Sequence, residues 1–195
     1  MSSAGQNNAD MLVRARECGG CQVCCITPTI DSADIQKDCN SPCRHLQGGC
    51  DIYETRPQVC RIFYCGWRRS RDFPDDWRPD LSGVFAVLEV NTLPQFKPLA
   101  IALHLVGNPL KTVRRPDFID FVVKNVRSDV ALYLMLPGGK GMLSSRLPLN
   151  NPPIMAAAAM SRADVRIVLE MLLKRLAAHP TTPYAMENSG HDVST

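Results

Sequence analysis

Hydrophobic positions are spread unevenly along the chain, and they predict regular secondary structure mainly in its second half. Three apolar runs predict strands at residues 83–90, 99–106 and 130–136, and a short strand near 142–147 would follow as a hairpin partner. The polar segment 91–97 would connect the first two strands. The Pro-Gly-Gly turn at 137–141 would join the last two as a hairpin. These elements predict a small sheet.

Two other segments carry apolar residues at helical spacing. Pro116 predicts the start of a helix that runs to about Val126. One side of this helix carries Phe118, Ile119, Val122, Val123 and Val126. Ser161 and Asp164 resemble a capping box and predict the start of a second helix, which Pro180 would end. Its apolar positions are Val165, Val168, Leu169, Leu172, Leu173 and Leu176.

The first part of the chain lacks this periodicity, which suggests a division into unlike regions. We expect the α+β class, in which a small cysteine-rich metal-binding region precedes a short mixed α/β part with two helices and three to four strands. The expected regions are an N-terminal extension at 1–15, a cysteine-cluster region at 16–68, a linker at 69–81, an α/β part at 82–180 and a disordered tail at 181–195.

Composition narrows the class of protein. With 195 residues, 45% of them hydrophobic and 21% charged, the chain can bury a core as one domain or as one domain plus a small module. No apolar run reaches the roughly 18 residues of a membrane span, and residues 1–10 lack the basic and apolar parts of a secretory signal. We therefore expect a cytoplasmic protein without a membrane partner.

Charge gives little support to nucleic-acid binding. The formal net charge is only +3. Arginines alternate with Trp67 and Trp77, a composition that can bind single strands by stacking, but four aspartates in the same stretch offset the arginines. We expect both tryptophans to dock on the core instead.

Cysteine placement is the most informative feature of the sequence. All nine cysteines lie between Cys18 and Cys65. Disulfide scaffolds spread their bridges over a secreted domain, and an odd number cannot pair completely within one chain. Clustered thiols in a reducing compartment are more often metal ligands or catalytic groups than inert packing residues.

The spacing of the first cysteines points to metal binding. Cys18, Cys21 and Cys24 follow one another at intervals of three, with two glycines after Cys18 that allow a tight turn. In an extended stretch, Cys24 and Cys25 would point to opposite sides, so they serve two sites or one of them is not a ligand.

The run from Cys18 to Cys25, together with Cys43-Arg-His-Leu and the stretch from Gly49 to Cys65, resembles the signature of the YkgJ-like cysteine-cluster family. The resemblance covers about residues 15–68, and it implies zinc or iron chelation. A more distant resemblance, to flagellin lysine N-methylases, implies methyl transfer. Cys39 looks like an addition to the family's usual set. The resemblance therefore implies eight candidate ligands: Cys18, Cys21, Cys24, Cys25, Cys43, Cys50, Cys60 and Cys65.

Two kinds of metal centre fit these residues. Three cysteines on one loop with a remote fourth, Cys60 or Cys65, are typical of a 4Fe–4S cluster, which we favour slightly. Structural zinc prefers separated pairs, and eight cysteines would fit two zinc sites or one cluster plus one zinc. We expect Arg56 and Arg61 to support the bound group, and His45 is a less favoured ligand.

The sequence therefore predicts a metal-binding protein with a structural, electron-transfer or metal-handling role, and a protein partner would fit such a role. The alternative is an enzyme that contains a cluster, such as an S-adenosylmethionine-dependent protein methyltransferase or an oxidoreductase. The second half offers no phosphate loop, nucleophile elbow or zinc-protease motif. His104, in an apolar run, is expected in the core or at an interface.

Overall fold

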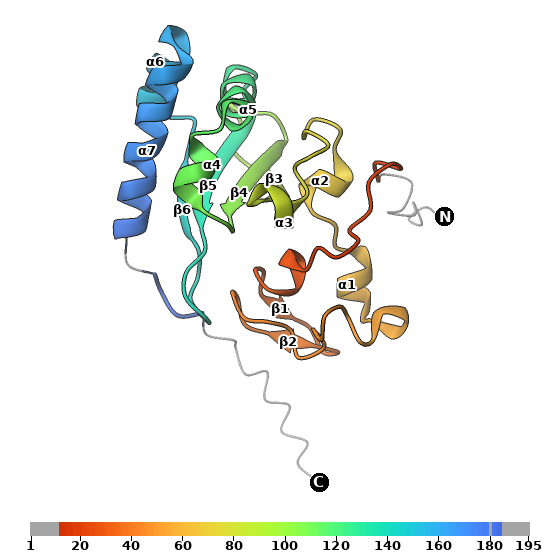
Figure 1. The fold of residues 1–195 in the computed structure, drawn as a ribbon. Helices are drawn as coiled ribbons and strands as arrows, with labels where there is room; N and C mark the ends of the chain where they lie inside the picture. The colour runs from red at the N-terminus through yellow and green to blue at the C-terminus, as the bar shows by residue number, and fades with distance from the viewer. Residues whose placement is uncertain (1–11, 180, 185–195) are drawn as a thin grey trace.

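A four-stranded sheet organises the second half of the chain in the computed structural model, which describes residues 12–179 and 181–184 (Figure 1). Its strands lie in the order β3 (Val84–Val90), β4 (Leu99–Leu105), β5 (Ala131–Leu136) and β6 (Ser145–Pro148). The β3–β4 and β5–β6 pairs are antiparallel, and β4 and β5 are parallel. The four predicted strands are confirmed, although β6 begins three residues later than the predicted run.

Helices cover one face of the sheet. Between the parallel strands the chain forms α4 (Pro109–Val113) and α5 (Pro116–Arg127), and α7 (Arg162–Ala178) packs beside α5. Alternate residues of the strands point toward these helices, and Leu103, Leu132 and Leu134 are fully buried there. Burial of these side chains fixes the register of the sheet.

Helix ends follow the local sequence. Pro116 opens α5 with Asp117 in its first turn and Lys124 and Arg127 in its last, charges that suit the helix dipole. At α7, Ser161 Oγ accepts from the Asp164 amide at 3.2 Å. The Asp164 carboxylate accepts from this hydroxyl rather than from a backbone amide, so only half of the predicted capping box forms.

A third substantial helix, α6 (Pro152–Met160), precedes α7. Asn151 caps it through Oδ1, which accepts from the Ile154 amide at 3.0 Å. The mixed α/β class is confirmed, while the described part of the chain has seven α-helices rather than the expected two.

The segment expected as a linker is packed into the core. It runs from the last residue of α2 (Gly66–Arg69) into α3 (Pro79–Ser82). Trp67, Phe73 and Trp77 are buried, and the Phe73 and Trp77 rings each lie 5.0 Å from the ring of Phe121 on α5. The expectation that both tryptophans dock on the core is confirmed.

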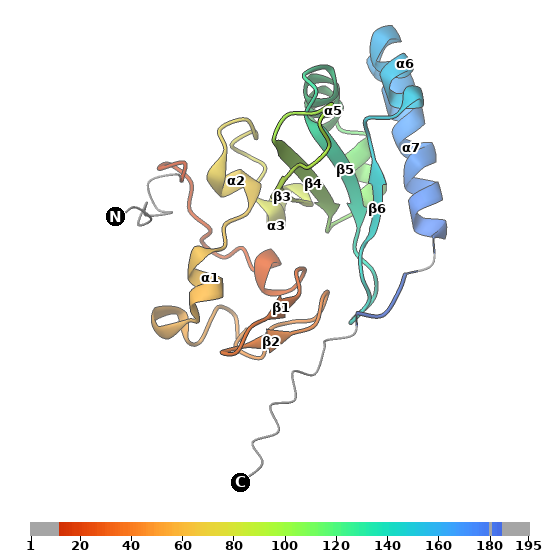
Figure 2. The same cartoon turned by 180° about the vertical axis from the view of Figure 1, so that it is seen from behind.

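The cysteine-rich lobe, residues 12–65, lies against one end of the sheet, as the views from both sides show (Figures 1 and 2). Its elements are short: η2 (Val23–Cys25), β1 (Ile30–Asp31), β2 (Gln36–Lys37), η3 (Tyr53–Thr55) and α1 (Gln58–Ile62). From residue 12 to residue 64, Ile35 and Cys39 are the only buried residues of the hydrophobic class. Apolar packing alone therefore gives the lobe little stability.

The β5–β6 hairpin joins the sheet to the lobe. Its Gly141 amide donates to Cys39 O at 2.9 Å, and Asn40 Nδ2 donates to Met142 O at 2.9 Å. Thr182 and Tyr184, from the segment expected as a tail, make backbone hydrogen bonds to Leu143 and Gly141 of this hairpin. Pro180 and residues 185–195 of that expectation lie outside the described residues.

Candidate metal centre

Four of the predicted ligands surround one small cavity. Cys18, Cys21, Cys24 and Cys65, here called the first cysteine set, line a space of about 30 Å³ together with the aromatic side chains of Phe63, Tyr64, Trp67 and Phe85. A tight turn brings the first two together: Gly19 has φ +49°, and the Cys21 amide donates to Cys18 O at 2.9 Å. Cys65, the fourth member, is the residue immediately before α2.

The surroundings of the first set bear on the protonation of its thiols. Burial, and to a smaller extent the negative charges of Cys18 and Cys21, raise the pKa of Cys65 to about 11. Amides at the start of α2 act the other way, because they donate to this sulfur. Burial also raises the pKa of Cys21, against hydrogen bonds from the amides of Val23 and Asp80. Amides aimed at sulfur are ready to stabilise a thiolate.

The other four predicted ligands form a second cysteine set: Cys25, Cys43, Cys50 and Cys60. Burial raises the pKa of Cys60, and the charges of Cys43, Cys25 and Cys50 raise it further, so all three lie near this sulfur. The Cys43 amide donates to Cys25 O at 2.9 Å, and Cys50 forms a β-bridge with Leu46. The second set therefore gathers residues from three separate loops and α1.

Cys24 and Cys25 are adjacent in the chain but have different neighbours. They lie in the 3₁₀ turn η2, so the expectation of an extended stretch is wrong. The cause is local, because the amides of Cys25 and Ile26 donate to Gln22 O and Val23 O. A hydrogen bond between the two thiols raises the pKa of Cys24 and lowers that of Cys25. The two sets therefore touch at this pair.

A buried lysine accompanies the second set. Lys37 is 5% exposed, and its Nζ donates to the carbonyl oxygens of Ile26, Asp38 and Ser41 at 2.8, 2.8 and 3.0 Å. Burial lowers its pKa, whereas the charges of Cys43, Cys39 and Cys25 raise it. This ammonium would offset thiolate charge in the second set. No local pattern in the sequence identifies it, because its partners are brought together by the fold.

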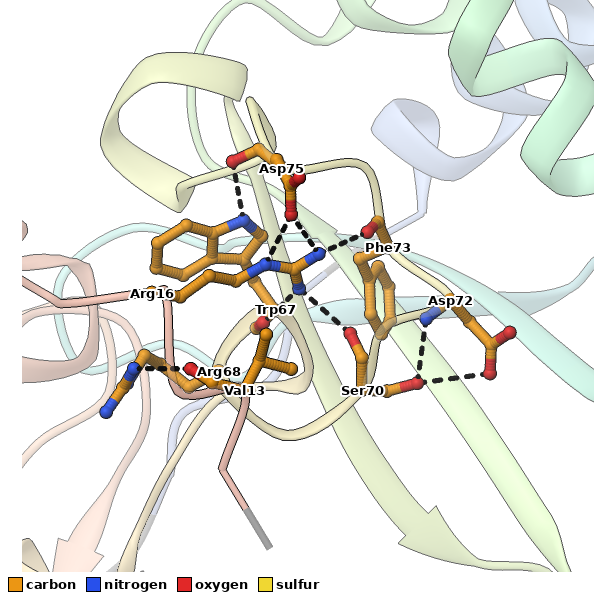
Figure 3. A network of polar contacts seen from close by, with 8 residues as sticks. All are labelled: Val13, Arg16, Trp67, Arg68, Ser70, Asp72, Phe73 and Asp75. Carbon is orange, nitrogen blue, oxygen red and sulfur yellow. Dashed lines mark hydrogen bonds and ion pairs between the residues drawn. The ribbon is translucent and has the colours of Figure 1, made fainter.

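Arg16 ties the start of the lobe to the segment after Cys65 (Figure 3). Its guanidinium donates to the carbonyls of Trp67, Ser70 and Phe73 and forms an ion pair with Asp75 at 2.7 Å. The same group lies 5.3 Å from the Trp67 ring centroid. Because Arg16 precedes Cys18 by two residues and Trp67 follows Cys65 by two, this network brings both ends of the first set together.

An ion pair borders the first set on its other side. Arg78, which lines the cavity, donates from Nε and Nη2 to the Asp80 carboxylate at 2.7 and 2.9 Å. The Asp80 carboxylate also forms a hydrogen bond with the Cys21 thiol. Arg78 therefore supplies the first set with a nearby cation, as Lys37 does for the second.

The remaining predicted residues lie around the second set. The Arg56 guanidinium stacks 3.8 Å from the Tyr53 ring centroid, and its charge opposes the rise in the pKa of Cys60. Arg61 is exposed on α1. His45 is engaged through both ring nitrogens, with Asp51 at 2.9 Å and Arg44 at 3.2 Å.

Two further candidates are not members of the cysteine sets. Cys39 is buried at the contact with the hairpin, and its charge, like those of Cys43 and Cys25, raises the pKa of Lys37 against the effect of burial. His104 lies beside Phe85 at 5.6 Å between ring centroids, and burial lowers its pKa to about 4. The expectation of a histidine in the core agrees with this position.

The donor chemistry of both sets suits a soft metal. All nine cysteines lie in the described part of the chain, and all are free thiols. Within that part, no group of three or more His, Cys, Asp or Glu side chains already has the arrangement of a metal site. The fit to a metal therefore rests on the four thiols that each set contains. Each set also has one cation nearby, Arg78 for the first and Lys37 for the second, and amides donate to sulfurs of the first.

Comparison with known proteins identifies no relative of this chain. The chain matches no family model, no curated protein and no solved structure. In the described residues, no helix combines the length and the apolar character needed to cross a membrane. The fold and the site thus define a mixed α/β protein whose small sheet carries a cysteine-rich lobe.

Proposed function

We propose that the protein binds two metal ions, one through Cys18, Cys21, Cys24 and Cys65 and one through Cys25, Cys43, Cys50 and Cys60. The grouping of eight thiols into two sets of four carries this proposal. Binding would draw the four sulfurs of each set together and release their protons, because thiolates are the ligands.

The division of the eight thiols into two sets of four favours single ions such as Zn²⁺. Four thiolates match the usual ligand number of a structural zinc site. Zn²⁺ with four thiolates supplies no redox chemistry and is typical of structural sites. Zinc is therefore our choice over the iron–sulfur cluster that the spacing alone favoured.

The role we propose for the metals is to hold the cysteine-rich lobe together and to the sheet. Small modules with few buried apolar residues usually depend on metals or disulfides. The lobe has few such residues, and its cysteines are free thiols. The first set also includes Cys65, so its metal would join the lobe to the start of α2. The cytoplasm, which keeps thiols reduced, suits this role.

Metal analysis of three cysteine variants tests the proposal. Cys21→Ser removes a ligand of the first set, and Cys60→Ser removes one of the second. We expect each variant to bind one metal ion fewer than the parent chain. Cys39→Ser is the matched control, because Cys39 is a buried cysteine that is not one of the eight proposed ligands, and it should keep the parent's metal content. Full metal content in Cys21→Ser and Cys60→Ser would contradict the proposal.

A further inference from the structure

A second and larger cavity lies at the carboxyl end of β4. It has a volume of about 540 Å³ and is bordered by α3, the loop after β4, α4 and the start of α5. This volume is in the range of small-molecule sites, and the carboxyl ends of parallel strands commonly form such sites. Gly83 and Gly107 both line it, and a Cβ added to Gly107 would lie 3.2 Å from the Gly83 Cα. Part of the lining is therefore bare backbone.

One wall of this cavity is fixed by its own hydrogen bonds. The Asp117 carboxylate accepts from Trp77 Nε1 at 2.6 Å and from Arg115 Nε at 3.1 Å. Arg115 Nη1 donates to Ser82 O at 2.9 Å. These charges are already paired within the protein, so they shape the cavity but leave little capacity for a ligand.

Three other polar groups that line the cavity have no partner among the described residues. They are the Asp76 carboxylate, the Lys111 ammonium and the amide nitrogen of the Asn108 side chain. Asp76 precedes α3 and Lys111 lies on α4, and no ion pair joins them. The cavity therefore offers one negative and one positive group, both exposed and from different segments of the chain.

We infer that this cavity binds a small aminocarboxylate zwitterion, with its ammonium group toward Asp76 and its carboxylate toward Lys111 and Asn108. A ligand of a single charge would leave one of the two protein charges unmatched, which lowers its affinity. Both a free amino acid and a short peptide carry this pair of groups. The inference does not depend on metal binding, although Asp80 lines this cavity and also contacts Cys21.

Calorimetric titration of the full chain tests the inference. The probes are the twenty common L-amino acids, one at a time, and the dipeptide Gly-Gly. We expect saturable binding of at least one probe. Amide-capped and N-acetylated forms of that probe, which carry one charge each, should bind about tenfold more weakly. Binding of amino acids would identify the free form as the ligand, and binding of Gly-Gly alone would identify a peptide.

Charge variants locate the binding site. Asp76→Asn and Lys111→Met should each weaken binding about tenfold. The matched controls are Asp72→Asn and Lys124→Met, an exposed pair 3.4 Å apart that does not line the cavity, and they should bind like the parent. Absence of binding by every probe, or equal binding in the Asp76 and Lys111 variants, would overturn the inference. Either result would leave the metal content of the cysteine sets unaffected.

Discussion

At the scale of single residues, the role of the cysteines as candidate ligands could be predicted from the sequence. The charged side chains that support them could not. The density and spacing of thiols are local properties of the sequence, so the region from Cys18 to Cys65 could be singled out as the candidate metal site. Arg16 acts through partners 51 to 59 residues away, and Lys37 through carbonyls 1, 4 and 11 residues away that the local fold brings around its ammonium. Arg56 and Arg61, chosen because they are close to Cys60 in the sequence, lie at the margin of the second set.

Replacement of Lys37 by Met should destabilise the second set. The buried ammonium satisfies three carbonyl oxygens, and its loss would leave them without donors, at a cost of about 3 kcal/mol. Urea unfolding of Lys37→Met, compared with the exposed control Lys124→Met, measures this cost. An unfolding free energy equal to that of the control would show that Lys37 has no such role.

Replacement of Arg16 by Met should affect the first set selectively. Without the guanidinium, the carbonyls of Trp67 and Phe73 lose a buried donor, and the chain before Cys18 loses its attachment to α2. We expect about 2–4 kcal/mol of destabilisation and weaker binding of one metal ion of the two. Arg14→Met, an exposed change two residues earlier, is the control in a competition titration with a zinc chelator. Equal chelator sensitivity in both variants would contradict this role.

At the scale of elements, the long periodic segments were predictable and the short or uniformly apolar ones were not. The strands β3, β4 and β5 and the helices α5 and α7 have clear periodicity and end signals. The sequence of α6 is almost entirely apolar, so it shows no helical pattern from which to predict it. The short helices α2 and α3 depend on tertiary packing, because α2 lies against β3 and the nearby Phe73 and Trp77 dock on α5.

The packing of α2 on β3 depends on a glycine. A Cβ at Gly66 would lie 2.9 Å from Phe73 Cε2 and 3.0 Å from the Ala86 Cβ, so Gly66→Ala should push α2 away from the sheet. The expected cost is about 1–3 kcal/mol, measured by urea unfolding. Gly49→Ala is the control, because nothing lies within 4 Å of its added Cβ. Equal stability of the two variants would show that α2 can adjust without cost.

At the scale of the whole molecule, stability is divided unequally between its two parts. The sheet and its helices share one extensive apolar core, while the lobe has two buried residues of the hydrophobic class before Cys65. Fold class was predictable because the hydrophobic pattern changes abruptly along the chain. The hairpin contact at Cys39 was not, because it joins residues about 100 positions apart.

Metal removal should therefore loosen the lobe and spare the sheet. With a chelator present, we expect amide hydrogens of residues 18–62 to exchange much faster, while those of β4 and β5 keep their protection. Hydrogen exchange followed by mass spectrometry gives both regions in one experiment. Equal acceleration in β4 and β5 would mean that the metals stabilise the whole fold cooperatively.

The central claim, two metal ions on two sets of four cysteines, is tested most directly by the metal and acid-labile sulfide content of anaerobically purified protein. The account predicts a colourless protein with two zinc ions per chain and no sulfide. Brown protein with iron and sulfide in equal amounts would contradict the assignment to single ions and would indicate a 4Fe–4S cluster. Protein that carries no metal, and binds none on reconstitution, would contradict metal binding itself.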